Sequence, residues 1–175
     1  MHRFHVLTGG PGSGKTTLVE RLAALGHVTA PEAGRGIIRD QVAFGGTLHT
    51  DPVAFLEAIL VWELRSYREA ERTSGPVWFD RGIPDVAGSY SQNGLPVPPH
   101  VDRAARALRY APVVFVAPPW REIYVDDEER KHPWEAAVRT YEVMVDAYTR
   151  YGYDLVELPR VPVDERLAFL LDPTS

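Results

Sequence analysis

The chain has 175 residues, a formal net charge of −5, 45% hydrophobic and 25% charged residues, and no cysteine. This composition excludes a disordered or fibrous protein, and the length fits one domain with its own core. Without cysteine there is neither a disulfide framework nor a thiolate nucleophile. The negative charge argues against a general nucleic-acid binder, whose affinity comes largely from a basic surface.

The N-terminal residues lack the apolar core of a signal peptide, and no run approaches the roughly 20 apolar residues of a membrane span. We therefore expect one cytoplasmic domain over residues 1–175, with neither a membrane nor a nucleic acid among its partners. The oligomeric state stays open, with a dimer among the alternatives.

Strands and helices alternate along the chain, which predicts a mostly parallel α/β sheet covered by helices on both faces. Strands are expected over 4–8, up to about 30, 77–80, 113–119 and 153–158, and helices over 16–26, 34–44, 51–72, 100–110, 133–151 and 164–171. Segment 83–99, IPDVAGSYSQNGLPVPP, is rich in Pro, Gly, Ser and Asn, which favours a short helical turn followed by a loop.

Two helices have a predicted core stripe at helical spacing. In the helix that Asp51-Pro52 opens, the stripe is Leu56, Leu60, Leu64 and Tyr67. In the helix over 133–151, it is Trp134, Val138, Tyr141, Val145 and Tyr148. We assign Trp134 and Tyr141 to packing.

The sequence GGPGSGKT at 9–16 matches the phosphate-loop pattern GxxxxGK[ST], between an apolar strand and an amphipathic helix. Its glycines let backbone N–H groups converge on a phosphate, and the helix N-terminus adds partial positive charge. Lys15 is expected to reach the outer phosphates, and the Thr16 hydroxyl to ligate Mg²⁺. The residues expected to bind the nucleotide are Gly10, Pro11, Gly12, Ser13, Gly14, Lys15, Thr16 and Thr17.

Charged residues follow the expected strands at the edge where an open α/β sheet places its ligands. Glu32 and Arg35 follow the second strand, and Asp80 and Arg81 close the third. The sequence PPWREIYVDDEERK follows the fourth.

These pairs resemble elements of the small P-loop kinases of the nucleoside and nucleotide kinase type. Thymidylate and deoxynucleoside kinases carry a Pro-Glu or Glu-Pro element after the second strand, and an Asp-Arg or Glu-Arg element after the third. Here those are Pro31-Glu32 and Asp80-Arg81. Through Pro31, Glu32, Arg35 and the segment 118–159, the chain also resembles AAA-type predicted ATPases. These are grouped with the kinase domain of the bifunctional nicotinamide-riboside kinase and regulator.

The resemblance implies a three-layer P-loop NTPase fold with a five-stranded parallel sheet and a short helical lid over about 119–133. It implies ATP and Mg²⁺ as cofactors, with Asp80 beside the metal and Glu32 accepting the proton of a substrate hydroxyl. Arg35 and Arg81 would contact the substrate. Lid cations would neutralise phosphate charge, the candidates being Arg121, Arg130 and Lys131.

Each of these roles has a simpler alternative. Glu32 as a solvated carboxylate would cap the next helix, and Arg35 and Arg81 would form structural ion pairs. The charged run over 126–131 would be a solvated surface.

The function that the sequence favours is Mg²⁺-ATP-dependent phosphorylation of a small molecule, on a hydroxyl or a phosphate of a nucleoside-like or nucleotide-like acceptor. The rival is a regulatory ATPase or nucleotide switch that acts through a protein partner. An oligomeric AAA+ motor is disfavoured, because the chain lacks room for the extra helical domain of such motors. The sequence leaves the acceptor open.

Overall fold

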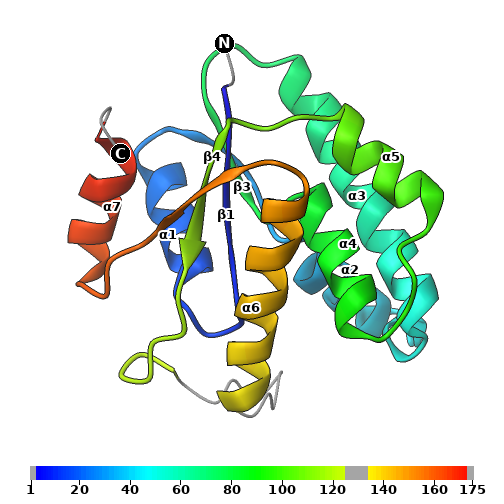
Figure 1. Cartoon of the computed structure of the whole chain (residues 1–175). Helices are drawn as coiled ribbons and strands as arrows, with labels where there is room; N and C mark the ends of the chain where they lie inside the picture. Colours follow the sequence, from blue (N-terminus) through cyan, green and yellow to red (C-terminus); the bar gives the residue numbers. More distant parts are fainter. Residues whose placement is uncertain (1–2, 125–133, 173–175) are drawn as a thin grey trace.

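A parallel sheet of five strands forms the centre of the computed structural model, which describes residues 3–124 and 134–172 (Figure 1). The strands are β1 (Phe4–Gly9), β2 (Val28–Ala30), β3 (Val77–Asp80), β4 (Val113–Ala117) and β5 (Asp154–Glu157). All pairings are parallel and the order is β2-β3-β1-β4-β5. The predicted parallel α/β sheet is therefore confirmed, and the glycine loop begins at the end of its central strand.

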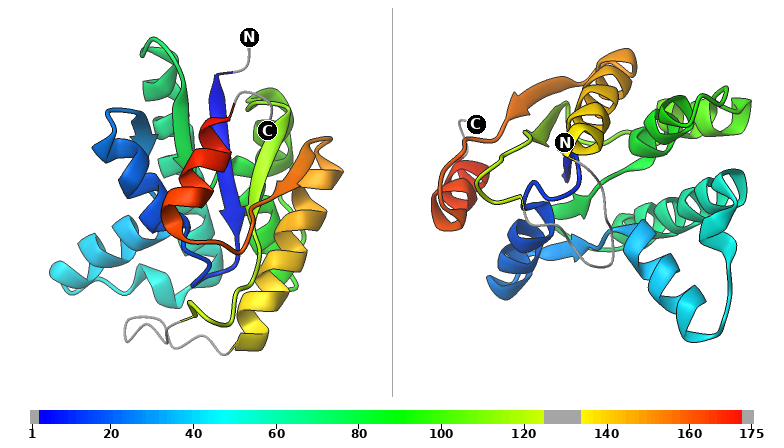
Figure 2. Two further views of the ribbon diagram at one scale, coloured as in Figure 1. Left: turned by 90° about the vertical axis from the view of Figure 1, so that its left-hand side faces the viewer. Right: turned by 90° about the horizontal axis from the view of Figure 1, so that it is seen from below.

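Helices cover both faces of this sheet (Figures 1 and 2). They are α1 (Lys15–Ala24), α2 (Ala33–Ala43), α3 (Pro52–Glu71), α4 (Ile83–Gln92), α5 (Pro99–Ala107), α6 (Trp134–Arg150) and α7 (Val163–Leu171), with a 3-10 turn η1 at Leu48–Thr50. Side chains alternate along β1, so Val6 packs in the core with α3 to α6, and Leu7 packs with α1 and α7. Among the described helices, none is long and apolar enough to cross a bilayer.

Helix α3 begins as its sequence predicts. The Asp51 carboxylate accepts hydrogen bonds from the backbone N–H groups of Val53 (3.0 Å) and Ala54 (3.1 Å). Leu56, Leu60 and Tyr67 are buried as expected. Leu64 is only partly buried, and the buried residue between Leu60 and Tyr67 is Glu63.

The prediction for 83–99 was right in placing a loop after the helical turn, over 93–98, but wrong about the helix, because residues 83–92 form the three-turn helix α4, which is largely buried. Its proline lies in the first turn, where a helix needs no N–H donor. Asp85 caps the same turn by accepting a hydrogen bond from the Gly82 backbone N–H at 2.9 Å. Gly88 marks close helix packing, since a Cβ there would lie 3.0 Å from Met144 Sδ and 3.2 Å from Ala147 Cβ on α6.

The predicted stripe of α6 was also wrong in its rotation about the helix axis. Its buried residues are Ala137, Met144, Ala147 and Tyr148, so only Tyr148 belongs to both sets. Tyr141, which we assigned to packing, donates a hydrogen bond from its hydroxyl to Glu157 Oε2 at 2.6 Å. The small residues at 137 and 147 let the helix approach its neighbours, which a count of large apolar residues overlooks.

Candidate active site

The glycine loop between β1 and α1 folds around the Lys15 side chain, which is 5% exposed. Its ammonium donates hydrogen bonds to the Gly10 carbonyl at 2.7 Å and to Ser13 Oγ at 3.2 Å. Burial first, and then the positive charge of Arg81, lower the pKa of Lys15 to about 8, against the opposing effects of Asp80, Glu32 and Asp85. The loop therefore holds a buried ammonium whose hydrogen bonds to described residues go to neutral oxygens, an arrangement that suits phosphate binding.

Two glycines let neighbouring side chains approach this loop closely. Gly12 and Gly14 have φ of 70° and 82°, in the left-handed region that favours glycine. A Cβ at Gly12 would lie 2.7 Å from the ring of Tyr124, and one at Gly14 would lie 3.0 Å from Arg166 Nη1. Thr17, the last predicted nucleotide contact, is exposed in the first turn of α1.

Arg166 of α7 is a neighbour of the loop that sequence reasoning missed. It is 3% exposed, and its Nη1 donates a hydrogen bond to the Ser13 carbonyl at 2.9 Å. Burial lowers its pKa. Arg166 lies more than 140 residues from the loop in sequence, and an arginine in an amphipathic helix is ordinarily a surface residue, so no local pattern pointed to it.

Asp80 ends β3 beside Thr16, and their arrangement fits a magnesium ion. Thr16 Oγ1 donates a hydrogen bond to Asp80 Oδ2 at 3.2 Å, while Asp80 Oδ1 is buried without a hydrogen-bond partner among the described residues. Burial raises the pKa of Asp80, and the Lys15 ammonium opposes that rise. An unpaired carboxylate oxygen next to a hydroxyl offers the hard oxygen donors that Mg²⁺ prefers. No cluster of three or more His, Asp or Glu side chains forms a metal site in the described part of the chain.

Glu32 and Arg81 face each other across the ends of β2 and β3. Glu32 occupies the N-cap position of α2, but its side chain makes no capping hydrogen bond within the described residues. It pairs instead with Arg81 (Nε to Oε1, 3.5 Å) and with Arg35 (Nε to Oε2, 3.2 Å). Arg35 is half exposed, whereas the side chains of Glu32 and Arg81 are mostly buried.

Arg81 is held in this position by a strained backbone. Its φ is 75°, which costs a residue other than glycine about 1–2 kcal/mol. Burial opposes ionisation of the guanidinium, yet the carboxylates of Glu32, Asp85 and Asp80 outweigh that effect and raise its pKa. Strain of this kind is typical of functional sites.

Asp85, in the first turn of α4, is a buried carboxylate that the sequence analysis missed. Oδ1 accepts hydrogen bonds from Thr8 Oγ1 (2.5 Å) and Arg81 Nη1 (3.1 Å). Oδ2 accepts from the Gly82 backbone N–H (2.9 Å) and from the Tyr148 hydroxyl (2.6 Å). This carboxylate thus ties β1, β3, α4 and α6 together and fixes the Arg81 guanidinium. An Asp at the third position of a helix that opens with proline was the available signal.

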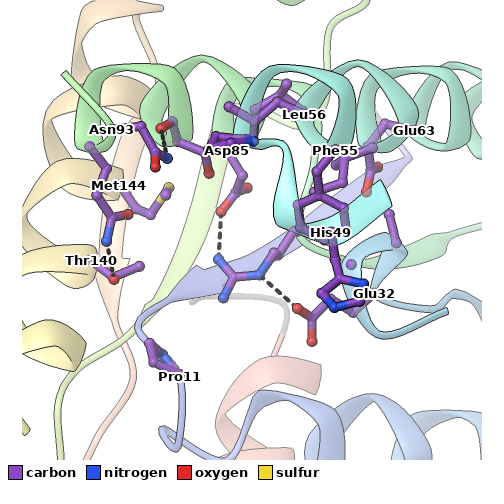
Figure 3. Close-up of a pocket in the computed structure, with 18 of the residues that line it drawn as sticks. Pro11, Glu32, His49, Phe55, Leu56, Glu63, Asp85, Asn93, Thr140 and Met144 are labelled. Carbon is purple, nitrogen blue, oxygen red and sulfur yellow. Dashed lines mark hydrogen bonds and ion pairs between the residues drawn. The ribbon is translucent and has the colours of Figure 1, made fainter. Parts of the chain in front are cut away.

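A pocket of about 450 Å³ opens between these groups and the loop (Figure 3). Pro11 lies at one side of it, and Glu32, Glu63 and Asp85 are among its polar lining residues. Phe55, Leu56, Ile59, Val86 and Met144 supply apolar walls. Its volume lies in the range of small-molecule sites.

The predicted lid is only partly within the described residues. Residues Arg121–Ile123 form a turn rather than a helix. The Arg121 guanidinium lies 5.0 Å from the ring centroid of Trp134, whose edge also packs on Tyr124. Arg130 and Lys131 lie outside the described residues.

Comparisons with known protein families and protein sequences show which family the chain belongs to. The model of the family described as AAA domain matches residues 4–166. No curated protein sequence matches the chain.

Three solved structures share the fold. The NadR protein in complex with NR has a TM-score of 0.73 and 20% identity, over 90% of this chain and 45% of that one. The chain thus spans less than half of NadR. Deoxyadenosine kinase from M. mycoides with bound products has a TM-score of 0.66 and 12% identity, over 98% of each chain. Thymidylate kinase from Ehrlichia chaffeensis has a TM-score of 0.63 and 16% identity, again over 98% of each. The expected P-loop kinase fold is therefore confirmed.

Proposed function

We propose that this chain, a member of the AAA domain family, is a kinase. In the proposed reaction it transfers the γ-phosphoryl group of ATP to a small-molecule acceptor. The observation that carries the proposal is the pocket beside the phosphate loop. Its carboxylate and guanidinium, Glu32 and Arg81, pair at 3.5 Å and both line a space of about 450 Å³. A plain hydrolase needs only room for water, whereas this volume fits an organic acceptor.

The residues divide the reaction between them. Lys15 and the loop N–H groups hold the donor phosphates, and Glu32 accepts the proton of the acceptor hydroxyl. As that O–H bond breaks, the acceptor oxygen forms a bond to the γ-phosphorus, and the bond to the bridging oxygen breaks. ADP leaves with that electron pair, so the products are a phosphate monoester, ADP and one proton.

Thr16 and Asp80 would hold the magnesium ion, supported by the unpaired Asp80 Oδ1. When bound, Mg²⁺ neutralises the phosphate charge that grows during transfer. Arg81 would add a second positive charge on the acceptor side. Its pairing with Glu32 and Asp85 fixes the guanidinium before the substrate arrives.

A screen of ATP consumption over nucleosides, nucleotides, nicotinamide riboside, sugars and antibiotics tests the proposal. Lys15→Ala is the blank, because it removes the phosphate-binding ammonium. We expect at least one acceptor to raise ADP formation well above the acceptor-free rate and to yield a phosphorylated product by mass spectrometry. Slow ATP hydrolysis that no acceptor stimulates would support the rival, a regulatory ATPase, and contradict the kinase.

A further inference from the structure

Glu63 is a buried acidic side chain that the proposed reaction does not use. It belongs to α3, is 3% exposed and lines the pocket. Figure 3 shows it on the far side of the pocket from Pro11, and no hydrogen bond or ion pair connects it to another described residue. Since Glu63 lines the pocket and its carboxyl group has no partner among the described residues, a ligand bound in the pocket can supply one.

The surroundings of Glu63 favour its neutral form. Burial raises the pKa of Glu63 well above its ordinary value, and the negative charges of Asp85 and Asp80 raise it further, opposed by Arg81. A neutral carboxyl group both donates and accepts hydrogen bonds. It therefore suits a ligand group such as an amide, a ring nitrogen or a hydroxyl.

The charges that line the pocket are a second observation, independent of Glu63. Two carboxylates, Glu32 and Asp85, line the pocket with Arg81, and the Arg81 guanidinium is already paired with both. Arg35 is not among the lining residues. A phosphate monoester carries about −1.5 to −2 charges near neutral pH and needs uncommitted cations. Besides Arg81, the described lining contains no lysine and no other arginine, and its one further basic side chain is the His49 imidazole.

From these observations we infer that the acceptor is an unphosphorylated small molecule of neutral or positive charge. Its apolar ring packs against Phe55, and its hydrogen-bonding group meets the Glu63 carboxyl. The inference rests on the proposed kinase activity and narrows it, because it selects a nucleoside-like hydroxyl compound over a nucleotide. Glu63 is then a residue that determines specificity, and it does not take part in the phosphoryl transfer.

Matched pairs of compounds test the charge requirement. Ribonucleosides, deoxynucleosides and nicotinamide riboside are each compared with their 5′-monophosphates, by calorimetric binding without ATP and by product analysis with ATP. We expect at least one parent compound to bind, and its monophosphate to bind at least about tenfold more weakly. Tighter binding of the monophosphates, or binding of no parent compound, would overturn the inference. Transfer to a monophosphate would keep the kinase and reject this acceptor class, whereas binding of a parent without transfer would reject only the kinase.

Two substitutions test Glu63 itself on the acceptor found in this way. Glu63→Gln keeps a neutral hydrogen-bonding group and should leave the acceptor KM within about threefold of wild type. Glu63→Leu removes that group and should raise the acceptor KM at least about tenfold, with the KM for ATP unchanged. Glu69→Gln, on the exposed side of α3 and paired with Arg65, is the matched control.

The two variants also separate recognition from a purely structural role. Because Leu is apolar, Glu63→Leu should not lower the Tm. An unchanged acceptor KM in the Leu variant, or a lower Tm with equal effects on both substrates, would show that Glu63 only stabilises the fold.

Discussion

The phosphate loop and the acceptor pocket adjoin each other, but they are built differently. The loop is one continuous stretch, Gly9–Thr16, whose hydrogen bonds to Lys15 come from its own residues. The polar lining of the pocket comes from separate elements: Glu32 before α2, Glu63 on α3, Arg81 after β3 and Asp85 on α4. The loop can therefore be recognised wherever its sequence occurs, while the pocket exists only once the chain has folded.

This difference suggests a division of labour in which the two regions can be disturbed separately. Substitutions in the pocket should change acceptor use and leave ATP binding intact, whereas changes at the loop should weaken ATP binding and leave acceptor binding intact. Asp80 and Arg81 are adjacent in sequence, yet Asp80 accepts a hydrogen bond from Thr16 beside the loop, whereas Arg81 pairs with Glu32 and Asp85 in the pocket. The following experiments test that separation.

The largest effect is expected for Glu32→Gln. The amide cannot accept a proton, so kcat for acceptor phosphorylation should fall by about 10²–10⁴-fold, with ATP affinity changed less than about twofold. Single-turnover kinetics and titration with a fluorescent ATP analogue measure the two quantities. Glu20→Gln, on the exposed surface of α1, is the control. A kcat close to wild type would mean that Glu32 only positions Arg81.

Asp85→Asn should chiefly weaken the framework of the acceptor side. The new amide nitrogen would face hydrogen-bond donors that now point at a carboxylate oxygen, and Arg81 would lose one of its two ion-pair partners. We expect the free energy of unfolding to fall by about 3 kcal/mol, measured by urea denaturation. Asp146→Asn, on the exposed face of α6, should leave it unchanged.

The same two regions differ in how far the sequence predicts them. Lys15, Thr16 and Asp80 follow from a contiguous motif and a strand end, and Glu32 follows from the end of β2. Asp85 was missed because Pro, Gly and Ser in α4 resemble a loop, although Asp85 and the tight packing at Gly88 make that segment a buried helix.

Glu63 was missed for a different reason. It lies at helical spacing between Leu60 and Tyr67, on the stripe that we assigned to the core, but its charge directed the assignment to Leu64. A charged residue on an apolar stripe is a signal that a site opens there. The tertiary position of Arg166 had no comparable local signal.

The pH dependence of ATP binding tests the loop alone. Because the pKa of Lys15 is about 8, its side chain loses the positive charge in the free protein above that pH. ATP binding then requires that Lys15 first take up a proton. Between pH 7 and pH 9 we expect the affinity for ATP to fall about tenfold, by fluorescence titration. Lys131→Arg replaces the other lysine of the chain and should leave this profile unchanged. A flat profile in the wild type would contradict the assignment.

The smallest effect is expected for Gly88→Ala, which changes the packing around a residue that lines the pocket. The new Cβ would lie 3.0 Å from Met144 Sδ and 3.2 Å from Ala147 Cβ, and Met144 also lines the pocket. Overpacking costs about 1–3 kcal/mol, while replacing a helical glycine returns up to about 1 kcal/mol, so the net loss of unfolding free energy should be about 1 kcal/mol. The acceptor KM should rise with it as Met144 moves, while the KM for ATP stays constant.

Adding Ala147→Gly to the Gly88→Ala variant shows whether this contact is the cause. If the two β-carbons compete for one space, the pair should be less destabilising than the sum of the single variants, by about 0.5 kcal/mol or more. Additive effects would mean that the two β-carbons do not compete for space. The loss of stability in Gly88→Ala would then come from the shorter contact, with Met144 Sδ at 3.0 Å.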